Sequence, residues 1–128
     1  SMDNARQVDR CPIREETGRE AATGMAKCSF DFDKTLLGML VDLSPKGFGI
    51  EIPYVTDSQV DTIKSMETYM ITVDFGDQKI ISTVKNKWNT VRFEDGVMIY
   101  RCGVEIDVIS PEDRLTLSTI IEKIRSSR

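Results

Sequence analysis

Two short groups of polar residues supply the side chains that could do chemistry in this chain. Arg10 and Arg14 form an R-x-x-x-R pattern; Asp42, Ser44 and Gly47 form a D-x-S-x-x-G pattern that begins 28 positions after Arg14. A guanidinium grips phosphate or the O6/N7 edge of guanine bidentately, and its face stacks on a purine. A carboxylate accepts hydrogen bonds, a hydroxyl donates one, and glycine lets a ligand approach the backbone. Together they predict a site for a purine carrying phosphate.

Each group also has a purely structural interpretation. Arg6, Arg10 and Arg14 follow one another at four-residue steps, which is typical of a solvated stripe on a helix. Pro12 argues against that helix, because proline inside a helix costs about 3 kcal/mol and pushes the preceding residue toward extended geometry. We therefore expect Arg10 and Arg14 on an irregular or extended arm. The second group also fits an ordinary turn between strands, with a local Asp or Ser hydrogen bond and a positive φ at Gly47.

Composition narrows the class of protein. The 128 residues suit one domain with its own core, and no apolar run approaches the length of a membrane span. The net charge of −4 argues against DNA or RNA as partners. There is no histidine, and the three cysteines form no metal-binding spacing. We expect reduced thiols, a cytoplasmic protein without a secretory signal, and no metal or cofactor.

The elements that must position these residues are mostly strands. Residues 1–24 are polar and interrupted by Pro12, Gly18 and Gly24, and we expect an arm there. Strands are predicted over residues 25–33, 35–43, 48–53, 68–75, 79–88, 91–93 and 97–108, with turns at Asp33–Lys34, 44–47, Gly76–Asp77 and 94–96. Asp57–Ser58 could cap a short helix through Lys64, and Ser110 and Pro111 begin a C-terminal amphipathic helix that ends near Ser126.

Six or seven short strands followed by one helix predict an all-β fold: a small six-stranded antiparallel barrel with a C-terminal α-helix packed against it. The predicted organisation is a single domain, with residues 1–24 as the arm and residues 25–128 as the barrel and helix.

The order and spacing of the two groups resemble the PilZ domain family of cyclic di-GMP receptors. Members carry R-x-x-x-R on an N-terminal arm and D-x-S-x-x-G on the barrel, and residues 10–125 look like that whole layout. The resemblance implies that Arg10 and Arg14 bind guanine and phosphate of cyclic di-GMP, and that Asp42, Ser44 and Gly47 contact a guanine from the barrel. Arg6 and Arg10 also read R-x-x-x-R; the distance from Arg14 to Asp42 suits the family better, so Arg10 and Arg14 are preferred.

The resemblance implies a bacterial receptor without catalysis, in which the arm closes over the nucleotide and signals to a partner protein or neighbouring domain in motility or exopolysaccharide control. Asp9, Glu15 and Glu16 depart from the family and would repel a dianion. They motivate the alternative, a degenerate PilZ-like domain that binds only protein. An enzyme would have to rest on carboxylates such as Asp31 and Asp33, and we expect no catalytic residue.

Overall fold

The computed structural model describes residues 19–21 and 26–127. In chain order the elements are β1 (Glu20–Ala21), β2 (Lys27–Phe30), β3 (Asp33–Ser44), β4 (Gly47–Pro53), α1 (Asp57–Ser65), β5 (Thr68–Asp74), β6 (Lys79–Glu94), β7 (Val97–Ile109) and α2 (Pro111–Ser126). The last strand therefore leads directly into the terminal helix, as the change of hydrophobic period at Ser110 predicts.

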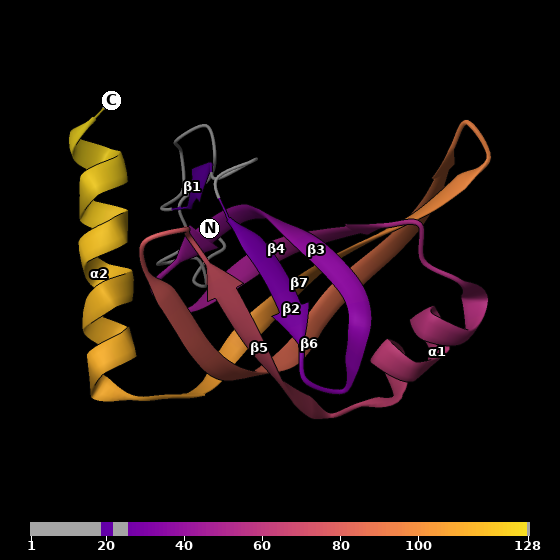
Figure 1. Cartoon of the computed structure of the whole chain (residues 1–128), viewed down its shortest axis with the longest axis horizontal. Coiled ribbons are helices and arrows are strands. Elements are labelled where there is room, and N and C mark those ends of the chain that lie inside the picture. Colours follow the sequence, from indigo (N-terminus) through magenta and orange to yellow (C-terminus); the bar gives the residue numbers. More distant parts are fainter. Residues whose placement is uncertain (1–18, 22–25, 128) are drawn as a thin grey trace, which may run out of the picture.

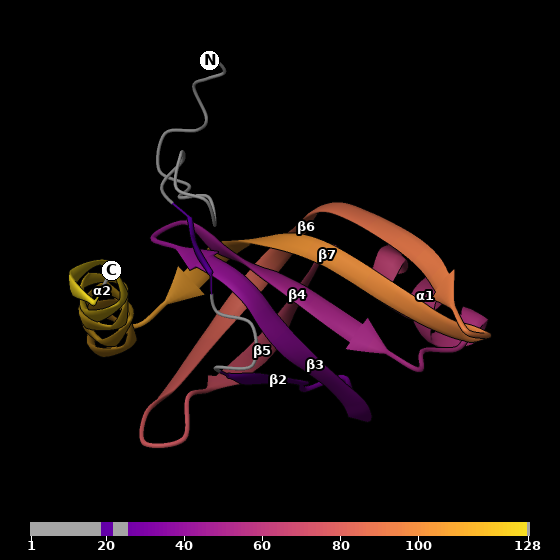
Figure 2. The same ribbon diagram turned by 90° about the horizontal axis from the view of Figure 1, so that it is seen from above.

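Six of the strands close into a barrel. The pairing runs β3–β2–β5–β6–β7–β4 and returns from β4 to β3, and every pair is antiparallel. The short β1 adds to the β3 edge beside β2 (Figures 1 and 2). The barrel with a C-terminal helix that the sequence predicts is confirmed. Closure leaves the long strands without an open edge.

Alternation along the strands fills the barrel interior. Phe48, Ile50 and Ile52 of β4 are all buried, as their period of two predicts. Helix α2 packs its apolar stripe, Leu117, Ile120 and Ile121, into the same core. Figure 2 shows α2 at one end of the barrel, well away from α1. The helix thus covers the end of the barrel at which β1 also lies.

The ends of the elements differ in places from the sequence expectations. The turn between β2 and β3 falls at Asp31–Phe32 rather than Asp33–Lys34, and Asp33 begins β3 with its Oδ1 accepting a hydrogen bond from the Thr35 N–H at 2.9 Å. Helix α1 exists, but Thr56 caps it in a reciprocal capping box, not Asp57 or Ser58.

The longest hairpin extends beyond the rest of the barrel. Strand β6 is continuous through the stretch near residue 90 where the sequence predicts a break, and it is joined to β7 by a turn at Asp95 and Gly96. These two residues have φ of +51° and +79°, which is the backbone of a tight two-residue turn. The hairpin tip projects away from α2 (Figure 1).

Cys28 and Cys102 are free thiols in the core. Burial raises the pKa of each to about 12, so both stay protonated at neutral pH. The expectation of reduced thiols is confirmed for these two cysteines, and Cys11 lies outside the described residues.

Candidate functional site

Three of the five predicted ligand residues lie where β3 turns into β4. Asp42 and Ser44 end β3, and Gly47 begins β4. Arg10 and Arg14 lie outside the described residues, as does the alternative Arg6. Asp42, Ser44 and Gly47 form the barrel side of the predicted site.

A one-residue shift in register puts Asp42 and Ser44 on the outside of the barrel wall. Leu40 pairs with Ile50, but the next pair is Asp42 with Gly49, so Val41 has no partner. Such a β-bulge exchanges the inner and outer faces for the residues that follow. Leu43 consequently faces the core opposite Phe48, and Asp42 takes the outer face. The site carboxylate owes its orientation to this bulge.

Asp42 lies on the outer face but is only 3% exposed. Its Oδ2 accepts a hydrogen bond from Nη1 of Arg19 at 3.1 Å, which is also an ion pair. The Nε of Arg19 is buried and has no acceptor within the described part of the chain. The guanidinium therefore holds the carboxylate through one nitrogen while another donor stays unsatisfied.

Gly49 makes room for the Asp42 side chain. A Cβ added at Gly49 would lie 2.6 Å from Asp42 Oδ1, closer than real Cβ contacts. Glycine in a strand interior weakens the strand and marks a close approach. The carboxylate lies over the bare backbone of β4, and a larger residue at Gly49 would push it aside.

The turn from Ser44 to Gly47 contains a local hydrogen bond at Ser44 and a close packing contact at Gly47. Ser44 Oγ accepts a hydrogen bond from the Lys46 N–H at 3.2 Å, which is the local bond of the structural interpretation. The expected positive φ at Gly47 is wrong: among the described glycines it occurs at Gly76 and Gly96. Gly47 is required for another reason, because its Cβ would lie 2.1 Å from the carbonyl oxygen of Val104 on β7.

Asp42 belongs to a row of four residues that crosses four strands. Asp42 pairs with Gly49, Gly49 with Gly103, and Gly103 with Trp88. A Cβ at Gly103 would lie 2.1 Å from Nε1 of Trp88, so the indole covers Gly103 as the carboxylate covers Gly49. Trp88 is 39% exposed and lies on the outer wall of the barrel. In this row the carboxylate of Asp42 lies over Gly49, and the flat indole of Trp88 lies over Gly103.

Sequence reasoning did not identify Gly49 and Gly103 as part of this site. The available signal was a glycine inside each of two apolar strand runs, but which side chain each would accommodate depends on register between strands. The sequence alone does not pair Arg19 with Asp42, which is 23 residues away.

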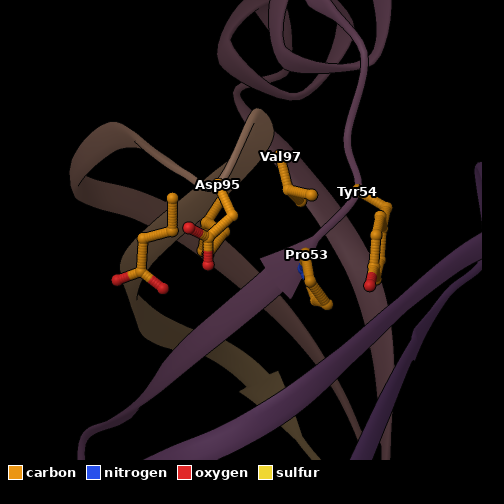
Figure 3. A pocket seen from close by; sticks show the side chains of 6 residues that line it. Pro53, Tyr54, Asp95 and Val97 are labelled. Atoms are coloured by element: carbon orange, nitrogen blue, oxygen red, sulfur yellow. The ribbon is translucent and has the colours of Figure 1, made fainter.

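A shallow pocket lies at the opposite end of β4. It encloses about 260 Å³ between Pro53, Tyr54, Glu94, Asp95, Val97 and Ile99. Asp95 and Tyr54 flank Val97 and Pro53 in Figure 3. Its charged lining residues are both acidic, which disfavours an anionic ligand. Gly47 and Pro53 are separated by six strand steps, about 20 Å, so the pocket is remote from Asp42.

Other kinds of site find no support in the described residues. They contain no cluster of three or more histidine, cysteine, aspartate or glutamate side chains that could hold a metal ion. Neither described helix is long and apolar enough to cross a membrane. Asp33, a conceivable catalytic carboxylate, accepts hydrogen bonds from Thr35 and Gln59, and the Thr35 bonds are the main cause of its lowered pKa.

Comparisons with known proteins identify the fold. No family model and no curated protein matches the sequence. Among solved structures, the PilZ domain of YcgR from Escherichia coli with c-di-GMP is similar with a TM-score of 0.64 and 20% identity, over 85% of this chain and 89% of that chain. The Borreliella burgdorferi PlzA protein in complex with c-di-GMP is similar with a TM-score of 0.51 and 10% identity, over 84% of this chain and 46% of that chain. The chain has the fold of a PilZ domain.

Proposed function

We propose that this PilZ-like domain is a receptor for cyclic di-GMP, with no catalytic activity. The observation that carries the proposal is the outward carboxylate of Asp42, held by Arg19 over the bare backbone of Gly49 at the β3–β4 end of the barrel. Both similar structures contain c-di-GMP, which supports the choice of ligand.

The proposed roles follow the chemistry of guanine and phosphate. Guanine presents N1–H and N2–H₂ donors side by side, and the two oxygens of Asp42 accept both. Ser44 supplies a hydroxyl, and Gly47 leaves the turn open for a close backbone contact. Arg10 and Arg14 are proposed to bind guanine O6/N7 and a phosphate, since the guanidinium fork fits either group.

The proposed output is a change of contacts rather than a reaction. Residues 1–24, proposed as the arm, close over the nucleotide and alter the surface that a partner protein or neighbouring domain meets. A cytoplasmic role in motility or exopolysaccharide control is part of the proposal. The net charge of −4 fits a small ligand at a local basic site better than long nucleic acid.

Isothermal titration calorimetry with cyclic di-GMP tests the proposal, with cyclic di-AMP as the control for guanine recognition. Wild type is expected to bind cyclic di-GMP and not cyclic di-AMP. Asp42→Ala and Arg14→Ala are each expected to weaken binding at least tenfold, because each removes a charged hydrogen-bond partner worth roughly 1.5–3 kcal/mol. Both variants should keep the wild-type circular dichroism spectrum.

Absence of heat with wild type at about 100 μM nucleotide, which corresponds to about −5.5 kcal/mol, would leave the protein-binding alternative as the function. Unchanged affinity in both variants would reject the assigned site.

The choice between arginine pairs is open to the same titration. Arg6→Ala, Arg10→Ala and Arg14→Ala remove one charge each from the same segment. We expect large losses for Arg10 and Arg14 and a small one for Arg6. A large loss for Arg6 with a small one for Arg14 would shift the working pair to Arg6 and Arg10.

A further inference from the structure

Strand β1 touches both the proposed nucleotide site and the C-terminal helix. Its two residues pair with the end of β3, Glu20 opposite Leu43 and Ala21 opposite Asp42. Figure 1 shows β1 on the side of the barrel that is near the C-terminal half of α2. With only two backbone pairs, the position of β1 depends strongly on the side chains that anchor it.

Two consecutive residues make these anchoring contacts in different directions. Arg19 donates to Asp42 Oδ2 at 3.1 Å, on the outer face of the wall. Glu20 is 2% exposed, and its Oε2 accepts a hydrogen bond from Nε of Arg125, in the last turn of α2, at 3.0 Å. Successive side chains of an extended segment point to opposite sides. The chain Asp42–Arg19–Glu20–Arg125 therefore runs from the site carboxylate to the end of the helix.

The contact at Asp42 is placed to compete with a ligand. Arg19 uses one oxygen of the carboxylate, whereas the paired donors of a guanine edge need both. Asp42 is 3% exposed, so a ligand must uncover it. The buried Nε of Arg19 without an acceptor in the described residues shows that this guanidinium is incompletely satisfied where it lies. Its release from Asp42 leaves fewer bonds to replace than release of a fully bonded arginine would.

We propose that cyclic di-GMP on Asp42 displaces Arg19, shifts β1 and loosens the Glu20–Arg125 pair, so that binding is transmitted to the last turn of α2. The proposal rests on the proposed function, and it adds the route by which nucleotide binding at the barrel changes the end of α2. Breaking one contact of this series weakens the next because Arg19 directly precedes Glu20, the first residue of the two-residue strand β1. The output surface is then the C-terminal end of α2, and the first turn of that helix stays anchored by Asp113, whose Oδ2 accepts the Ile81 N–H at 3.0 Å.

Hydrogen exchange measured by mass spectrometry tests the structural step. Amides of residues 121–127 are expected to exchange several-fold faster with saturating cyclic di-GMP than without it, because local opening becomes easier. Helix α1, residues 57–65, is the internal control and should be unchanged. Exchange at 121–127 that is unchanged or slower with ligand would overturn the proposal.

Reciprocity gives a second test that does not depend on exchange. If the nucleotide weakens the Glu20–Arg125 contact, loss of that contact must strengthen nucleotide binding by the same factor. Arg125→Gln is expected to bind cyclic di-GMP about 3- to 10-fold more tightly than Lys123→Gln, which removes the same charge from an exposed position on the same helix. Equal affinities in these two variants, or weaker binding by Arg125→Gln, would also overturn the coupling.

The two proposals fail in different ways. Wild type that does not bind cyclic di-GMP in calorimetry refutes the receptor function. Wild type that binds, with α2 exchange and Arg125→Gln affinity both unaffected, keeps the receptor function and refutes the route through β1.

Discussion

At the scale of single residues, the position of Asp42 depends both on a glycine beneath its carboxylate and on a hydrogen bond from Arg19. Gly49 offers no side chain beneath the carboxylate, and Arg19 holds one of its oxygens. The sequence predicts Asp42 as a ligand residue because of its place in D-x-S-x-x-G. It does not predict the glycine under it, because pairing between β3 and β4 at the bulge depends on tertiary register.

Gly49→Ala is expected to impair the site without deleting any functional group. The new Cβ would lie 2.6 Å from Asp42 Oδ1, so the carboxylate must move. Cyclic di-GMP affinity measured by calorimetry should fall at least tenfold, with a cost in folding stability of about 1 kcal/mol, the centre of the usual range for point substitutions. Because both changes act through one carboxylate, Gly49→Ala combined with Asp42→Ala should bind no more weakly than Asp42→Ala alone.

Wild-type affinity in Gly49→Ala would contradict the position assigned to Asp42. A further loss in the double variant would show that Gly49 contributes to binding by a separate route.

At the scale of elements, α2 is the part of the fold whose local sequence and observed structure agree most closely. Ser110 accepts the Asp113 N–H at 3.0 Å, Pro111 opens the first turn, and Lys123 and Arg125 lie in the last. Helix signals of this kind depend on neighbours in sequence, so they can be predicted without the fold. The end of β2 shows the opposite case: Asp31 rather than Asp33 lies in the turn, and its Oδ1 accepts the Met70 N–H from β5, a contact that only the sheet creates.

Ser110→Ala should lower the free energy of unfolding by about 1 kcal/mol, because it removes the side chain that caps α2. Ser118→Ala is the matched control, since Ser118 is exposed within the same helix and alanine is a better helix former there. Urea denaturation monitored by circular dichroism compares the two. Equal loss of stability in both variants would show that the cap contributes little.

At the scale of the whole molecule, the closed barrel has a core with buried groups that resist ionisation. Burial raises the pKa of Cys28 and Cys102 from an ordinary 9.0 to about 12, and burial likewise raises the pKa of Tyr69. The sequence predicts only that these three residues lie in strands. The sequence cannot predict the size of the pKa shifts, because these depend on how completely the closed barrel buries the three side chains.

The pH dependence of stability follows from these raised pKa values. Below pH 9 the thiols are protonated in folded and unfolded chains alike, so their full stabilising contribution is present. Above pH 9 the unfolded chain loses protons that the folded chain retains, and stability falls until about pH 12, where the folded thiols also ionise. Between pH 8 and pH 10 the loss should be about 1 kcal/mol per thiol.

Urea denaturation at several pH values measures this decline. A Cys28→Ala, Cys102→Ala variant should be less stable at neutral pH but show a shallower alkaline loss. The same steepness in the variant as in wild type would assign the decline to other groups.

The unpartnered Val41 has a consequence for how such a site could be lost. Because the bulge decides which way the following side chains turn, a straight strand in which Val41 paired with Gly49 would aim the carboxylate of Asp42 inward and Leu43 out toward solvent. Every predicted ligand residue would still be present in the same order. In barrels built like this one, a slip of strand register by a single position would abolish the proposed site while its signature stayed intact, so an unbroken signature alone would not guarantee ligand binding.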